Sequence, residues 1–193
     1  MAAAGKVTTG FSKPYVAVYA ASGGTITYTN GQQLARGVDV TISPETSDDN
    51  NFYADNVVAE VVASEFSGGT LSLTVDGLLP AAEKLIYGLP TATGGWTAFG
   101  DDMAIPYVGV GFIIRQQSDG AVTYVPVVLA KCKFSLKEDA AATQEDSIDW
   151  QTQSLEATIL RGDDSNRNWK FLGDEVATEA AAEAALRTKL GIA

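Results

Sequence analysis

Histidine is absent from this 193-residue chain, and cysteine occurs only once, as Cys132. The lack of histidine excludes Ser-His-Asp and Cys-His nucleophile pairs, and every metal site that needs an imidazole. One cysteine can form neither an intramolecular disulfide nor a thiolate zinc site. Its place in the apolar run VVLAKCKF predicts a buried, inert thiol. The commonest routes to catalysis are therefore closed, and carboxylate chemistry alone stays open.

Basic residues and long apolar runs are also scarce. The chain has 13 Lys and Arg against 24 Asp and Glu, a formal net charge of −11. A grip on nucleic acid needs clustered bases, so this balance disfavours a nucleic-acid-binding protein, although DNA can pass an acidic surface without adhering. No window reaches the roughly 18 apolar residues of a membrane helix. The N-terminus, MAAAGKVTTG, lacks the apolar core of a signal peptide. We expect no membrane partner and a chain kept in the cytoplasm until assembly or lysis.

Short β-type segments between turn signals make up most of the chain. Alternating or β-rich runs predict strands over 15–20, 25–29, 34–43, 57–64, 71–75, 107–117, 121–134 and 148–160. Asn30-Gly31 and 118–120 predict tight turns. We expect strand 57–64 to pair with strand 71–75 across residues 67–69. The pattern is typical of an all-β sandwich or barrel.

Two helices are predicted beside these strands. Pro80 and Gly88 bound a helix over 80–87. A second runs over 175–190, with Asp174 as its N-cap and Gly191 at its end. The sequence therefore predicts an N-terminal arm (1–12), a sandwich domain (13–173) with a long loop over 43–56, and a C-terminal helix (174–193).

The predicted loop over 43–56 is acidic and holds two aromatics, Phe52 and Tyr53. Long loops are uncommon in compact domains unless they are functional or disordered, and aromatics argue against disorder. Counted from Asp49 as an EF-hand, the loop places Tyr53 at a ligand position and Ala54 where a glycine is needed, so a calcium site is disfavoured. A second block, over 138–156, has six acids and no base. Such blocks indicate either a working surface or a merely solubilising one.

Two alternatives to a structural role follow from side-chain types. Trp96 and Trp169 are candidate platforms for a sugar or host surface, whereas Trp150 lies in an alternating segment and is predicted to be core. Adjacent carboxylates such as Asp101 and Asp102 could serve glycoside hydrolysis, which needs two acids across a cleft. Adjacent acids in polar loops are more often solvated charge.

A family resemblance extends over most of residues 10–190. The segments ARGVDVTISPETSDDNNFYADNVVAE, GTLSLTVDGL and AAEKLIYGL, then KCKFSLKEDAAATQEDSIDWQTQSLEATI and TEAAAEAALRTKLG, resemble the major tail protein family of long-tailed phages of Gram-positive bacteria. FYADN within an acidic loop is the most specific piece. The resemblance implies a tail tube subunit, without catalysis or cofactor, whose sandwich cores form hexameric rings that stack into a tube.

The resemblance also implies partners and surfaces. The partners are other copies of the chain, tape measure and tail-end proteins, and DNA in transit, and the location is the virion tail. A long loop and the terminal segments bridge rings, and strands line an acidic lumen. The subunit contacts so implied are Pro44, Asp48, Asp49, Phe52, Tyr53 and Asp55. The candidate lumen acids are Asp39, Glu60, Glu65, Asp76, Glu145, Asp149 and Glu156. Which acids face the lumen depends on strand register, because a slip of one residue reverses every side chain.

Overall fold

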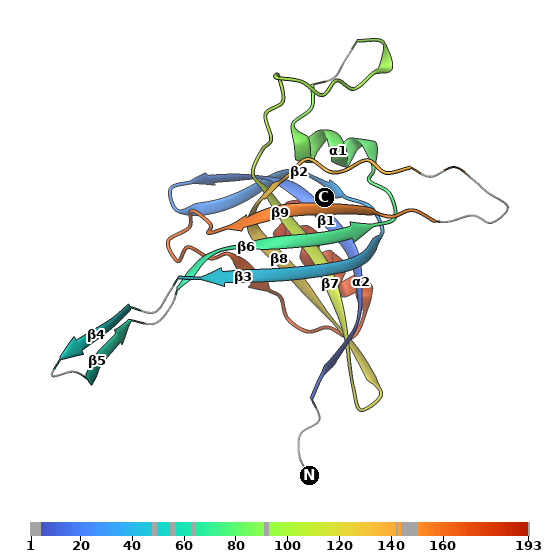
Figure 1. Ribbon diagram of the computed structural model, residues 1–193. Helices are drawn as coiled ribbons and strands as arrows, with labels where there is room; N and C mark the ends of the chain where they lie inside the picture. The colour runs from blue at the N-terminus through green and yellow to red at the C-terminus, as the bar shows by residue number, and fades with distance from the viewer. Residues whose placement is uncertain are drawn as a thin grey trace.

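The computed structural model describes residues 5–47, 50–54, 57–62, 65–90, 93–141, 143 and 150–192. Its elements are β1 (Val7–Ser22), β2 (Thr25–Gln33), β3 (Gly37–Thr46), β4 (Asn50–Ala54), β5 (Val57–Val62), β6 (Phe66–Val75), α1 (Pro80–Tyr87), η1 (Thr93–Gly95), β7 (Val108–Ser118), β8 (Ala121–Phe134), β9 (Gln153–Leu160), β10 (Lys170–Leu172) and α2 (Glu179–Lys189). Figure 1 shows most strands gathered in one body, with β4 and β5 projecting from one end.

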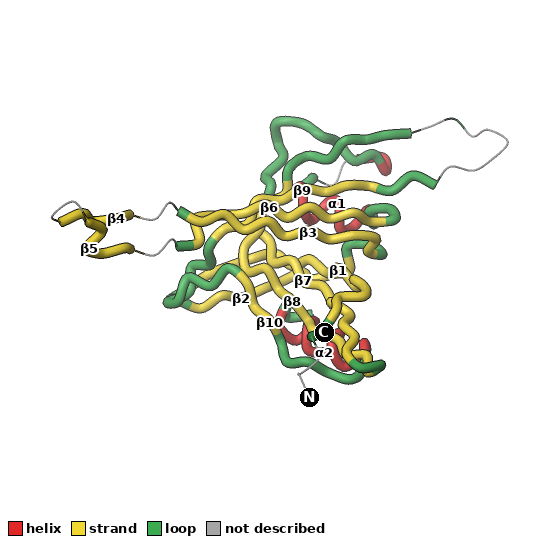
Figure 2. The backbone as a smooth tube through the Cα atoms, turned by 60° about the horizontal axis from the view of Figure 1, so that its bottom comes forward, coloured by secondary structure: helices red, strands yellow, loops and turns green. Residues whose placement is uncertain are grey.

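A single antiparallel sheet, in the order β2-β1-β7-β8-β9-β6-β3 with β10 also on β8, forms this body. Along one edge of β8, residues 127–129 pair with β10 and residues 131–134 pair with β9. The sheet folds over at this strand, so that β3, β6 and β9 form one layer and β1, β7 and β8 form another (Figure 2). The predicted mainly β sandwich with a flanking and a terminal helix is confirmed.

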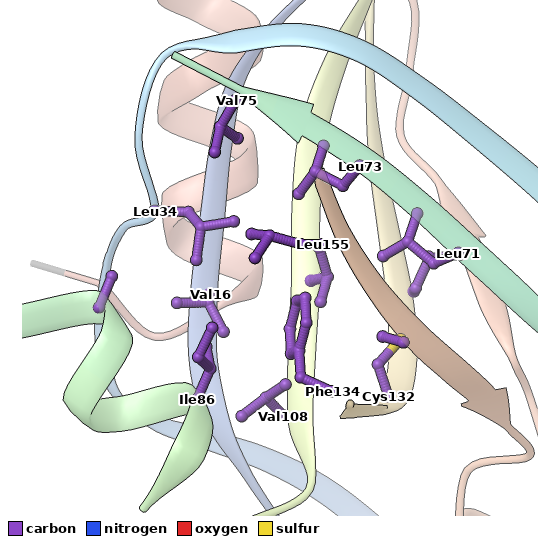
Figure 3. Close-up of a cluster of buried hydrophobic side chains, with 14 of the residues drawn as sticks. Val16, Leu34, Leu71, Leu73, Val75, Ile86, Val108, Cys132, Phe134 and Leu155 are labelled. Carbon is purple, nitrogen blue, oxygen red and sulfur yellow. The ribbon is translucent and has the colours of Figure 1, made fainter. Parts of the chain in front are cut away.

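The main core lies between the two layers (Figure 3). Leu71, Leu73 and Leu155 enter it from β6 and β9, and they meet side chains such as Phe134 and Cys132 from β8. The helix α1 closes one end and has the predicted bounds, and Gly88, in the left-handed region at φ 58°, is its C-cap. Cys132 is fully buried, as predicted, and burial raises the pKa of its thiol.

A second apolar cluster covers the opposite side of β1, β7 and β8. Ala182, Leu186 and Leu190 of the C-terminal helix region pack there against Ile113 and Val128. A Cβ placed on Gly111 of β7 would lie 2.6 Å from a Leu186 methyl, so the glycine permits this close approach. The strands β1, β7 and β8 therefore lie between the other strand layer and the C-terminal helix, and we call them the middle layer. Their central residues are buried on both faces, which explains their uninterrupted apolar runs.

Two predicted turns had different outcomes. Asp119 and Gly120 have φ values of 48° and 81° and join β7 to β8, so this hairpin prediction is confirmed. Asn30-Gly31 was predicted to turn the chain, and this is wrong: both residues lie inside β2. They form a bulge, since Val18 pairs with Thr29 and Val16 with Gln32. The positive φ of Asn30 (53°) serves the bulge instead of a turn.

Both predicted terminal boundaries need correction. The arm was predicted to end at residue 12, but β1 begins at Val7 and pairs with β7 from its first residue. The C-terminal helix was predicted to begin at 175 under an Asp174 cap. It begins at Glu179, and the Thr178 side chain accepts the cap hydrogen bond from the Ala181 N–H. Gly191 follows the helix at φ 63°, as expected.

The predicted loop over 43–56 is largely β-structure. The strand β3 continues to Thr46, and β4 and β5 pair with each other as a separate two-stranded sheet. The predicted pairing of 57–64 with 71–75 is therefore wrong, and β6 pairs with β3 and β9 instead. We call residues 47–65, which contain β4 and β5, the projecting hairpin.

Candidate functional site

The side of β3, β6 and β9 that points away from the core consists mainly of hydroxyl side chains. Strand register places them in three rows, which we call the outer face: Asp39, Thr74 and Ser154; Thr41, Ser72 and Glu156; Ser43, Thr70 and Thr158. Alternate positions such as Leu73 and Leu155 are buried, so the pleat points these nine side chains outwards. All nine side chains of the outer face are polar.

Two of the candidate lumen acids belong to this face. Asp39 and Glu156 are both exposed, in neighbouring rows on β3 and β9. Lys133 of β8, which pairs with Thr158, is exposed at the edge of the face. The charge of the outer face is therefore sparse, and hydroxyl groups outnumber carboxylates.

Other candidate lumen acids lie elsewhere. Asp76 follows β6 and pairs with Arg36. Although burial raises the pKa of Asp76, hydrogen bonds from Arg36 hold it below its usual value. Glu65 lies at the base of the projecting hairpin, 3.1 Å from Arg161. Glu60 is in β5, where the structure gives the backbone course alone. Glu145 and Asp149 lie outside the described residues.

The projecting hairpin leaves the sheet where β3 and β6 separate. The Ser47 N–H donates to the Glu65 carbonyl at 2.8 Å, and the Glu65 N–H donates to the Ser47 hydroxyl at 3.1 Å. Beyond this clasp, Figure 1 shows β4 and β5 standing clear of the sandwich. Ser47 and Glu65 are thus in contact although 17 residues of the chain lie between them.

The predicted contact residues fall in or beside this hairpin. Pro44 is exposed near the end of β3 and pairs with Gly69. Phe52 and Tyr53 lie in β4 at a register shift, which places a bulge in the hairpin. Asp48, Asp49 and Asp55 lie outside the described residues, and the last two belong to the calcium pattern. Among the residues that the structure describes, no group of three or more His, Cys, Asp or Glu side chains could hold a metal ion.

A group of basic side chains near the hairpin base was not singled out from the sequence. Lys131, Arg161 and Arg167 line a pocket of about 460 Å³ together with Phe66, Tyr107 and Asp163. The signal that could have revealed it is the concentration of scarce bases over 131–170, in a chain that has only 13. Strands β8 and β9 and the loop after β9 bring these bases together.

The burial of the three tryptophans differs from the predictions. Trp150 was predicted to be core, but it is 83% exposed, because β9 begins only at Gln153. Trp169 stacks on Phe66 with centroids 4.4 Å apart and packs against the core, which makes it a poor sugar platform. Trp96 is 82% exposed. Asp101 and Asp102 are exposed neighbours in one turn and do not face each other across a cleft.

No helix in the described part of the chain is both long and apolar enough to cross a bilayer. Comparison with protein-family models and with curated proteins returns no match.

Proposed function

We propose that the chain is a structural subunit that assembles with copies of itself into stacked rings, forming a tube through which DNA passes, as in a phage tail. The projecting hairpin is the observation that carries this proposal. An isolated two-stranded hairpin is marginally stable in water, and among the described strands β4 and β5 pair only with each other. Packing against a neighbouring copy would supply the support that no other described strand of its own chain gives the hairpin.

The outer face supports the second part of the proposal, a channel for DNA. Adhesion to phosphate depends on Lys and Arg, each of which releases counterions when it neutralises a phosphate. The nine positions of the outer face include no base and two acids, Asp39 and Glu156. Hydroxyl groups keep such a wall hydrated and offer a polyanion no cation at these nine positions, and the exposed Lys133 lies only at the edge of the face. In this assembly the outer face lines the lumen, and tape measure and tail-end proteins are the further partners in the virion.

The clasp between Ser47 and Glu65 allows a sharp test. Residues 48–64 are replaced by Asn-Gly, a two-residue turn that suits antiparallel strands such as β3 and β6. Purified wild-type protein is expected to form rings or tubes in negative-stain electron microscopy. The excised variant is expected to stay monomeric in sedimentation velocity, with a thermal midpoint close to that of the wild type, since the sandwich core is untouched.

A matched control separates loss of contact from loss of fold. Replacing the turn residues Gly23-Gly24 with Asn-Gly alters a different exposed hairpin, that of β1 and β2, keeps the pairing of Ser22 with Thr25, and should leave assembly intact. Tubes of wild-type length from the excised variant would overturn the role of the hairpin. A wild-type protein that stays monomeric at high concentration would overturn the tube.

Exposed Trp96 favours a second candidate, a module that recognises carbohydrate or a host surface. A flat, exposed indole is a suitable platform for a sugar ring, and Phe99 of the same loop is 55% exposed. The test is glycan-array binding by the wild type and by Trp96→Ala. Binding that disappears in the variant, from a protein that forms no rings, would favour this candidate over the tube.

A further inference from the structure

The two ends of β9 differ in charge. The strand ends at Leu160, beside the pocket lined by Lys131, Arg161 and Arg167, which we call the basic pocket. It begins at Gln153, directly after the segment that joins β8 to β9, and we call the described residues of that segment, 135–141, 143 and 150–152, the acidic connection. Eight extended residues separate the two features by about 25 Å.

Among the described residues, two of the three basic side chains in the basic pocket pair with carboxylates of the same chain, and the third does not. Lys131 lies 2.8 Å from Asp163, and its ammonium is 4.5 Å from the centre of the Tyr107 ring. Arg161 pairs with Glu65 and donates to the Phe66 carbonyl. Arg167 lines the same pocket and is exposed, and it forms no ion pair with any carboxylate in the described part of the chain. The pocket therefore presents aromatic walls and an uncompensated guanidinium.

The acidic connection has the complementary features. Glu138 is exposed, while its neighbour Asp139 is occupied by Lys137, which also pairs with Glu83. Apolar side chains flank the acids, since Leu136 is 60% exposed and Trp150 is 83% exposed. Tryptophans that bury on association dominate many protein interfaces. A connection that carries an exposed tryptophan and an exposed carboxylate suits a pocket with aromatic walls and a free cation.

We infer that the basic pocket of one copy receives the acidic connection of a second copy. This inference rests on the proposed function and adds the polarity of the contact. Because β9 separates the two features within a chain, the partner must be another molecule that presents its opposite end. The projecting hairpin leaves from the same end as the pocket and already commits Glu65 to Arg161, so it fits the pocket less well. A contact between unlike patches is heterologous, and it generates rings or open filaments.

Charge exchange tests the contact. Arg167→Glu and Glu138→Arg should each raise the critical concentration for assembly roughly fivefold to tenfold, because each places like charges together where an ion pair stood. The double variant Arg167→Glu/Glu138→Arg should return it to within about twofold of the wild type. Trp150→Ala should raise it without rescue by either exchange. Light scattering and sedimentation measure the critical concentration, and circular dichroism confirms the fold of each variant.

Arg115→Glu is the matched control, because Arg115 is exposed on β7, away from the pocket, and the charge change is the same. Single variants that assemble like the wild type, or a double variant that is no better than the singles, would overturn the contact and leave the tube standing. A monomeric wild type would overturn both. If Arg167→Glu weakens binding of a short DNA duplex but leaves assembly unchanged, the pocket binds phosphate and the inference is wrong.

Discussion

The two layers of the sandwich belong to one sheet but are built from different sequence patterns. In the middle layer, which consists of β1, β7 and β8, every residue from Val108 to Ile113 is buried. In the outer layer, which consists of β3, β6 and β9, buried and exposed residues alternate strictly along β9. Leu155, Ala157 and Ile159 are buried, and the residues between them are exposed. The difference comes from α2, which covers the far side of one layer and leaves that of the other bare. The apolar pattern of a strand thus indicates whether one or both of its faces are buried.

The largest expected effect comes from the middle layer. Phe112 is fully buried and stacks edge-on against Phe11, with centroids 5.5 Å apart. Phe112→Ala should lower the free energy of unfolding by about 3–5 kcal/mol, through lost burial and a cavity. Urea denaturation measures the loss. Ser72→Ala, on the outer face, is the control and should change stability by less than about 0.5 kcal/mol. Comparable losses at the two positions would contradict the distinction between the layers.

The packing of α2 on the middle layer can be tested where the helix comes closest to β7, at Leu186 and Gly111. Leu186→Ala should cost about 2–4 kcal/mol, and Gly111→Ala about 1–3 kcal/mol, because the new methyl would meet the Leu186 side chain. In the double variant the methyl occupies the space that Leu186 vacates, so its cost should be less than the sum. Denaturation of all four proteins gives the coupling free energy. Additive losses would mean that the helix does not press on β7.

A smaller effect is expected from the polar edge of the same contact. The Tyr15 hydroxyl donates to Glu183 at 2.5 Å, Lys13 lies 3.3 Å away, and together they hold the pKa of Glu183 below 4.5. A depressed carboxyl pKa stabilises the fold above pH 4.5, and this contribution disappears as the pH falls through the folded-state value. Glu183→Gln should therefore cost about 1 kcal/mol at pH 7. Denaturation at pH 7 and pH 3 should show the difference shrinking, and a pH-independent cost would argue against the ion pair.

The smallest effect is expected on the outer face itself. Ser72→Lys adds a cation at the middle of the face and should change monomer stability by less than about 0.5 kcal/mol, because the position is solvated. It should nevertheless raise the affinity of assembled tubes for short DNA duplexes, in a salt-dependent manner. Fluorescence anisotropy at two salt concentrations measures this. Thr27→Lys, on the exposed side of β2, is the control for charge alone.

Local signals made much of the fold predictable from sequence. Pro80 and Gly88 bounded a helix, and Asp119-Gly120 set a hairpin, because these residues act through their own backbone geometry. Partners distant in sequence were not predictable. The Asn30-Gly31 pair suits a turn or a bulge equally well, and only the pairing of β1 with β2 selects the bulge. Trp150 continued an alternating pattern beyond the start of the strand, where it is exposed because none of the described strands covers it.

The candidate site was predictable in composition but not in arrangement. The acid surplus and the segment around Phe52 were evident in the sequence, yet the segment is a hairpin where a loop was predicted. Asp39 and Glu156 share a face because β6 aligns β3 with β9, and that register is not written in either strand alone. The basic pocket depended on residues from three segments, so spacing along the chain could not reveal it.

The pairing of β1 with β7 has a consequence for how the chain is made. Val18 pairs with Val108, ninety residues later, and Val7 pairs with Gln117. Until the ribosome has delivered β7, one edge of the β1–β2 hairpin has no strand beside it. Contacts so distant in sequence make folding slow, on the order of milliseconds to seconds, and expose apolar edges meanwhile. The rate at which the complete sandwich forms is therefore governed by the second half of the chain.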